Sequence, residues 1–222
     1  TSLLLQAPMA VVAVLLFGVG LASVFLTPVI YLAYDVGSVE HHRWLTWLMQ
    51  FGGGVAILPF ALAAAVGLAT APRPVPSVRA LQAALIASLV LFSAGGMIGL
   101  MIQGSNVKIP AHYHGCIVGI TLAFMGLTYH LLPRMGFGQV AGRAATWQPY
   151  VYGGGQLLHI IGLVWSGGYG MQRKVGGASQ VLRSTEEVMA MGLMGLGAVI
   201  AGGGGFMFLV IVIRAIRGGG NA

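Results

Sequence analysis

Two histidines separated by one residue, His112 and His114, lie where a long apolar segment of the chain begins, within the stretch KIPAHYHGCIVG. On an α-helix, residues two positions apart point about 200° away from each other and are offset by about 3 Å along the axis. The two rings cannot readily bind one metal ion together, but each can hold its own centre at nearly the same depth. Neutral imidazole is a common ligand of haem iron, so this spacing suits two haems that flank one helix. The alternative is that both rings hydrogen-bond with water or lipid headgroups at the end of a membrane span.

The other four histidines fall into three places. His41 and His42 are adjacent, in a short loop, and can bind one metal if the backbone bends or a third ligand joins from elsewhere. Histidines at a membrane interface are the equal alternative. His130 lies 16 residues beyond His114, about 24 Å further along a helix, and cannot serve the same centre. For His159, deep in QLLHIIGL, we expect a buried hydrogen bond to a neighbouring helix.

The composition that must position these residues is typical of an integral membrane protein. Of the 222 residues, 57% are hydrophobic and only 7% are charged, which is too few charges for an ordinary water-facing surface. Six stretches contain no Asp, Glu, Lys or Arg, and each reaches the roughly 20 residues that a helix needs to cross a bilayer. Segments of about ten residues with alternating polarity, which would indicate a β-barrel, do not occur. We therefore predict an all-α bundle of six transmembrane helices, at about 8–34, 44–72, 80–103, 110–133, 146–171 and 186–213.

The charge and cysteine patterns exclude several other classes. The net charge is +7, but the eleven basic residues are spread singly over the loops and form no run or stripe, which argues against a nucleic-acid partner. The single cysteine, Cys116, allows no intrachain disulfide and no covalent haem attachment. We therefore expect any metal or cofactor to be bound non-covalently through histidine. From the apolar composition we expect membrane lipid to be a partner.

The loops predict one domain, 1–222, with both termini on the same side of the membrane. The apolar run at the N-terminus is too long for a signal peptide and is predicted to be a true span. The motif STEE predicts a capped start for the last helix. Six basic residues fall on the side of the termini and five on the other, which favours a cytoplasmic location of the termini. Basic residues on an outer face suggest an anionic partner there, such as haem propionates.

The stretch AHYHGCIVGITLAFMGLTYHLLPRMG resembles the tenth helix of subunit I of the haem–copper oxidases and nitric oxide reductases. That helix carries His-x-His followed by His-x-x-Pro-x-x-x-Gly, and both halves are present here as His112-Tyr-His114 and as His130-Leu-Leu-Pro133 with Gly136. The flanking stretches LVLFSAGGMIGLMIQGSNVKIP and HIIGLVWSGGYGMQRK resemble the ninth helix and the end of the eleventh. The six spans would then correspond to the second half of a twelve-helix subunit.

The resemblance implies a role for each candidate ligand. His112 would be the proximal ligand of the high-spin, gas-reducing haem, and His114 an axial ligand of the low-spin haem. His41 and His42 would match the paired copper ligands that follow the seventh helix. The haem would be of a, b or o type.

Two further residues, Arg173 and Lys174, would pair with haem propionates, although the sequence has Gln172 where the family has proline. The family's remaining low-spin and copper ligands lie in helices that have no counterpart here, so a partner chain resembling the N-terminal half of subunit I would supply them.

The function implied is that of a haem-binding subunit of a respiratory complex in a bacterial or archaeal cytoplasmic membrane. It would carry electrons from a donor such as cytochrome c or quinol toward O2 or NO, as part of a terminal oxidase or nitric oxide reductase. Two alternatives stay open. One is a degenerate relative with a structural or assembly role, in which hydrogen bonds satisfy the histidines. The other is a cytochrome b-type, quinol-oxidising membrane anchor, which needs histidines paired across two helices at matching depth.

Overall fold

The structure is a computed structural model, which describes residues 2–54, 57–172, 174, 181–182 and 184–218. These residues are helical or connect helices, and no strand occurs among them beyond one isolated bridge. The chain divides into two compact units, Thr1–Ala71 and Pro72–Ala222. Each unit is considered by itself, and the single domain predicted over 1–222 stays a prediction.

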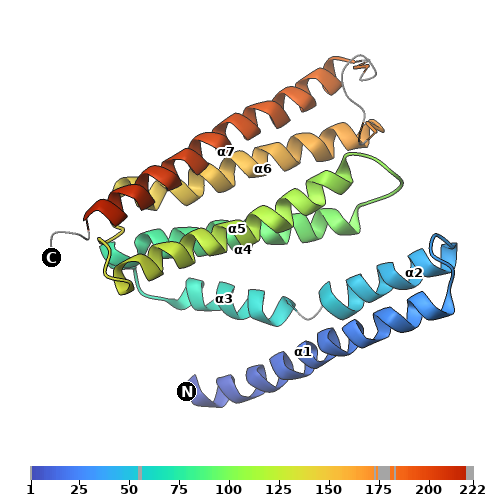
Figure 1. The fold of residues 1–222 in the computed structure, drawn as a ribbon, viewed down its shortest axis with the longest axis horizontal. Coiled ribbons are helices and arrows are strands. Elements are labelled where there is room, and N and C mark those ends of the chain that lie inside the picture. Colours follow the sequence, from blue (N-terminus) through green and yellow to red (C-terminus); the bar gives the residue numbers. More distant parts are fainter. Residues whose placement is uncertain (1, 55–56, 173, 175–180, 183, 219–222) are drawn as a thin grey trace. The chain divides into compact units, whose positions relative to one another are not determined.

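The first unit consists of one long helix and a broken one. Helix α1 (Ser2–Ala33) packs along α2 (Val39–Trp47), the π-helix η1 (Leu48–Gly54) and α3 (Leu58–Thr70) (Figure 1). The loop between α1 and α2 turns at Gly37, whose φ of +96° lies in a region that glycine enters without steric cost. Ser38 then begins α2, because its side-chain oxygen accepts a hydrogen bond from the backbone N–H of His41 at 3.1 Å.

The second unit is an up-and-down bundle of four helices (Figure 1). After a short 3₁₀ turn (Pro76–Val78), α4 (Arg79–Leu100) packs beside α5 (Lys108–Arg134), and α6 (Arg143–Gly168) packs beside α7 (Thr185–Gly218). Helix α6 also contacts α4 and α5, so it joins the two pairs. The predicted cap of the last helix is confirmed, since the Ser184 side-chain oxygen accepts from the backbone N–H of Glu187 at 3.2 Å.

The two helices of each pair approach closely at glycine residues. A Cβ added to Gly95 of α4 would lie 2.5 Å from the backbone nitrogen of Cys116, and one added to Gly115 of α5 would lie 2.5 Å from the Cα of Gly95. In the other pair, a Cβ on Gly162 of α6 would lie 2.5 Å from the backbone nitrogen of Met194 of α7. Small residues therefore set how near the helices approach.

Several helices are long and apolar enough to cross a membrane, which agrees with a multi-pass membrane protein. Among the described residues five segments qualify: Val14–Ala33, Val39–Thr70, Pro76–Leu100, Lys108–Arg134 and Thr185–Gly218. The sixth predicted span falls on α6 and is not confirmed, because that helix is long enough but carries too many polar side chains, among them Gln148, Gln156 and His159. The side on which the termini lie stays a prediction.

The neighbouring glycines Gly95 and Gly96 provide a test of the α4–α5 contact. We expect Gly95→Ala to lower the free energy of unfolding in detergent by about 1–3 kcal/mol, because the new methyl group would overlap the α5 backbone. Gly96 has no neighbour within 4 Å of an added Cβ, so Gly96→Ala is expected to be neutral or to stabilise by up to about 1 kcal/mol through helix propensity. Equal effects of the two substitutions in a thermal or denaturant titration would contradict the packing described above.

Candidate functional site

The start of α5 is held against the end of α6 by a short backbone contact. Asn106 and Gln172 form an antiparallel bridge, and the backbone N–H of Val107 donates to the carbonyl of Met171 at 3.1 Å. The side-chain oxygen of Asn106 accepts from the backbone N–H of Lys108 at 2.9 Å, which satisfies one of the free donors of the first helical turn. The segment that carries the two separated histidines is thereby fixed to the loop that leads into the predicted propionate-binding residues.

His112 lies against α4. Its Nδ1 is 2.7 Å from the carbonyl oxygen of Gly95, and because a carbonyl only accepts, we assign the ring proton to Nδ1. In the neutral ring Nε2 is then the acceptor, and it has no hydrogen-bond partner among the described residues. A Cβ on Gly99 would lie 2.7 Å from Nδ1, so a larger residue at that position would displace the ring. The thiol of Cys116 lies 3.8 Å from the same nitrogen.

His114 lies on the other side of α5, toward α6. Its ring stacks on that of Tyr113, with centroids 5.4 Å apart, and meets the ring of His159 edge-on at 5.0 Å and 65°. His159 in turn donates from Nδ1 to the carbonyl oxygen of Met194 on α7 at 3.0 Å. The hydrogen bond expected for His159 is therefore confirmed. The two histidines of the pair contact different helices, as their spacing predicts.

His41 and His42 lie in the first unit, and the structure corrects their predicted place in a loop. Because Ser38 caps α2, the helix begins at Val39 and includes both residues in its first turn. His41 is 3% exposed and packs edge-on against Tyr31, with ring centroids 4.7 Å apart. Both of its ring nitrogens are buried and lack a hydrogen-bond partner within the described chain. His42 is exposed, and its ring lies 5.7 Å from that of His41 at an angle of 76°.

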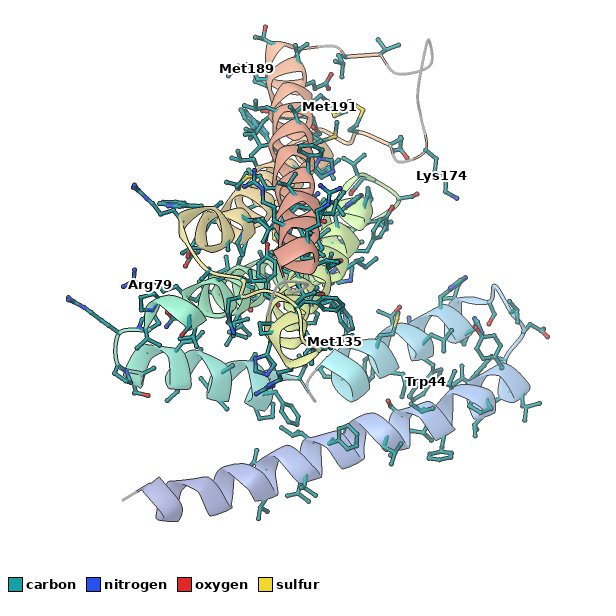
Figure 2. All side chains as sticks on the ribbon, turned by 60° about the vertical axis from the view of Figure 1, so that its left-hand side comes forward. Trp44, Arg79, Met135, Lys174, Met189 and Met191 are labelled. Carbon is teal, nitrogen blue, oxygen red and sulfur yellow. The ribbon has the colours of Figure 1, made fainter. Side chains whose placement is uncertain are left out.

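The predicted propionate-binding residues are described only in part. Arg173 lies outside the described residues. Lys174 is exposed, has a φ of +63°, and extends from the loop between α6 and α7 away from the helices (Figure 2). At the other end of α5, the exposed Arg134 donates to Nε2 of His130, which places His130 far from the separated pair as predicted.

A complete metal site is not formed by this chain alone as far as the structure describes it. No three His, Cys, Asp or Glu side chains come together in an arrangement that could hold a metal ion among those residues. Neither His41 with His42 nor His114 with His159 has a third such ligand there. Metal binding at either pair would need further ligands from other polypeptide or from a cofactor.

A buried polar network at the far end of the bundle was not predicted. The hydroxyl of Tyr129 donates to Oε1 of Gln148 at 2.9 Å, and Nε2 of Gln148 lies 3.1 Å from the carbonyl oxygen of Gly204 and 3.5 Å from the sulfur of Met125. Gln148 is fully buried. A glutamine inside an otherwise apolar stretch was the available signal, since a buried amide must find partners. The network joins α5, α6 and α7.

These features define an all-helical membrane protein with a cluster of histidines at one end of a four-helix bundle. The chain is similar to two proteins that are both described as uncharacterised. One, from Rickettsia prowazekii (strain Madrid E), is 38% identical over 138 residues, covering 57% of this chain and 26% of the relative. The other, from Aquifex aeolicus (strain VF5), is 29% identical over 129 residues, covering 58% of this chain and 30% of the relative. The chain thus spans less than a third of either relative.

No protein-family model matches the chain. No solved structure matches it either. The resemblance to the haem–copper oxidases therefore stays a prediction that rests on the sequence motifs.

The unpaired ring of His41 yields a prediction about stability. A buried polar group without a partner costs about 1–3 kcal/mol, and an apolar residue of similar size avoids that cost. In the absence of added metal, we expect His41→Leu to have the same free energy of unfolding as the wild-type chain or one higher by about 1–3 kcal/mol, measured by denaturant titration in detergent. His42→Leu, at an exposed position, is the control and should stay within about 0.5 kcal/mol. A marked loss of stability in His41→Leu alone would mean that its ring nitrogens have a partner.

Proposed function

We propose that this chain is a haem-binding membrane subunit of a respiratory complex similar to the haem–copper oxidases. The observation that carries the proposal is the hydrogen bond from His112 Nδ1 to the carbonyl of Gly95, at 2.7 Å. Histidines that bind a metal almost always donate the other ring N–H to a carbonyl, carboxylate or water, which fixes the tautomer and the ring orientation. His112 has this arrangement, with Nε2 left as the free acceptor.

The environment of His112 fits an axial ligand in a second respect. Gly99 and Gly95 occupy positions on α4 where any side chain would press on the ring or on the α5 backbone. The ring therefore has one defined position between two helices, and rigid support of this kind is what a ligand of a large planar cofactor needs.

His114 fits a second centre on the opposite side of α5. Its ring nitrogens have no hydrogen-bond partner among the described residues, and its ring is held between Tyr113 and His159. Two imidazoles on opposite sides of one iron would have centroids on the order of 6 Å apart, since each metal–nitrogen bond is about 2.0 Å. The 5.0 Å separation from His159 leaves no room for an iron between these two rings. The contact thus does not favour the cytochrome b-type anchor, and we propose that the second ligand comes from other polypeptide.

The cationic residues near this end of the bundle support the same assignment. Lys108 precedes His112 by one helical turn, and Lys174 follows the bridge formed by Asn106 and Gln172. Positive side chains at this end could pair with the propionates of the haems, because charge-assisted hydrogen bonds are the strong ones near apolar surroundings. We include Arg173 in this role on the basis of the sequence resemblance.

The copper part of the proposal rests on His41. Buried polar groups are almost always paired, so the two unpaired ring nitrogens of His41 need an explanation, and a metal ion would account for one of them. Imidazole suits copper, zinc and iron. His41 and His42 would supply two ligands, and the remaining ones would come from polypeptide outside these 222 residues.

When bound, the haems would supply reversible one-electron transfer, and the partner of the complex would be an electron donor such as cytochrome c or quinol. The chain's own residues would bind and orient the haems. His112 and His114 would each hold one haem, the contact with Gly95 would fix the ring of His112, and the cations would pair with the carboxylates. We place the complex in a bacterial or archaeal cytoplasmic membrane.

The test is spectroscopic. We expect the complex purified from its native membrane to show reduced-minus-oxidised haem bands. His112→Ala should remove the high-spin component of the spectrum, and His114→Ala should remove the low-spin component. Each substitution should lower the haem content by about one of two haems, because each removes an axial nitrogen ligand. His130→Ala is the matched control, since it removes an imidazole from the exposed far end of the same helix.

Two results would contradict the proposal. The first is a native complex that contains no haem, and the second is a spectrum that is unchanged in both His112→Ala and His114→Ala. Either would favour a structural or assembly role in which the histidines serve only as hydrogen-bonding groups between helices.

A further inference from the structure

Five arginines gather at the end of the four-helix bundle where α4 and α6 begin and α5 and α7 end (Figure 1). We call them the arginine surface: Arg79, Arg134, Arg143, Arg214 and Arg217. One buried apolar cluster joins these four helix ends, and each of the following members lies within two residues of an arginine: Ala80, Leu132, Ala145 and Ala215. Basic residues that are spread singly along the sequence are thereby brought to one end of the fold.

The arginine surface has no acidic residue of its own unit beside it. The two carboxylates of this unit, Glu186 and Glu187, lie in the first turn of α7, and Arg214 lies near the other end of that helix, about 40 Å away. All five arginines are exposed. Two of them have hydrogen bonds among the described residues, and neither acceptor is an acid. Arg79 donates from Nε to the carbonyl of Pro74 at 3.3 Å, and Arg134 donates to His130.

Helix dipoles do not account for this arrangement. The C-terminal end of a helix favours a positive charge, which suits Arg134 and Arg217 in the last turns of α5 and α7. Arg79 and Arg143 are instead the first residues of α4 and α6, where the dipole disfavours a positive charge. Like charges gathered at one end also repel one another. The surface is therefore unfavourable by itself, and an external anion would stabilise it.

The position of the arginine surface points to the lipid headgroup region as the source of that anion. Three of the four helices, α4, α5 and α7, are candidate membrane spans, and the arginines lie at their ends. On α6, the exposed Trp147 lies one turn beyond Arg143, and its ring meets that of Tyr150 edge-on at 6.0 Å. Exposed Trp and Tyr are typical of the membrane interface, where headgroups begin.

We propose that the arginine surface binds the headgroups of anionic phospholipids, such as phosphatidylglycerol, through their phosphodiester oxygens. The guanidinium group presents a planar fork of N–H donors that matches two phosphate oxygens, whereas an ammonium group acts as a point charge. All five cations here are arginine, and the two lysines of the chain, Lys108 and Lys174, lie toward the other end of the bundle. This inference goes beyond the proposed function and does not depend on haem binding.

The experiment measures lipid binding to the full chain in detergent by native mass spectrometry. The probes are phosphatidylglycerol and phosphatidylcholine with the same acyl chains. We expect the wild type to prefer phosphatidylglycerol, because the choline group of the other lipid neutralises its phosphate. Arg143→Gln combined with Arg214→Gln should weaken phosphatidylglycerol binding by about 25-fold, since each cation near an anionic lipid contributes about fivefold in affinity.

Two further double variants serve as controls. Arg143→Lys combined with Arg214→Lys keeps the charge but loses the fork, and should weaken binding less than the glutamine pair. Lys108→Gln combined with Lys174→Gln removes the same charge from the other end of the bundle and should leave the affinity for phosphatidylglycerol within about twofold of wild type.

Three results would overturn the inference. One is equal binding of the two lipids by the wild type, and another is an equal loss of phosphatidylglycerol binding in the arginine and lysine glutamine pairs. The third is binding of polyglutamate to the arginines without a preference between the lipids, which would indicate an acidic protein segment as the partner. If the arginine pair does not accumulate, Arg143→Gln alone decides: a loss of about fivefold supports the inference, and an unchanged affinity overturns it.

Discussion

The distance between neighbouring helix backbones is the constraint on which the rest of the bundle depends. Gly95 and Gly115 allow α4 and α5 to approach so closely that a single methyl group would not fit between them. The carbonyl of Gly95 thereby comes within reach of His112. In the second pair, Gly162 lets α6 approach α7 at Met194. The carbonyl oxygen of Met194 accepts the hydrogen bond from Nδ1 of His159. Both histidine orientations thus follow from where a glycine lets two neighbouring helices approach.

Much of the helical framework could be predicted from the positions of charged residues. The stretch predicted as 110–133 became α5 (Lys108–Arg134), and Ser184 caps the last helix as its motif indicated. Uncharged length alone could not predict where a helix changes its winding. The second predicted helix, 44–72, begins instead at Val39, because Ser38 offers a cap, and it passes through a π-helical segment at Leu48–Gly54.

The candidate site was predicted only to the extent that it depends on one helix. The separation of two residues fixes the relative directions of His112 and His114 whatever surrounds them. Their partners depend on how α4, α6 and α7 are aligned with α5, and glycine contacts between distant parts of the sequence set that alignment. The contact between His114 and His159 and the network around Gln148 were therefore not predictable from spacing.

The polar side of α6 has a consequence for the way the bundle is assembled. Gln148 is satisfied by groups from α5 and α7, and His159 by a carbonyl of α7. An isolated α6 would leave these groups without hydrogen-bond partners. An unpaired amide in apolar surroundings costs several kcal/mol. Helix α6 therefore cannot be removed from water at low free-energy cost before α5 and α7 are packed beside it. The folding of α6 is therefore coupled to that of α5 and α7, which supply the hydrogen-bond partners that the isolated helix would lack.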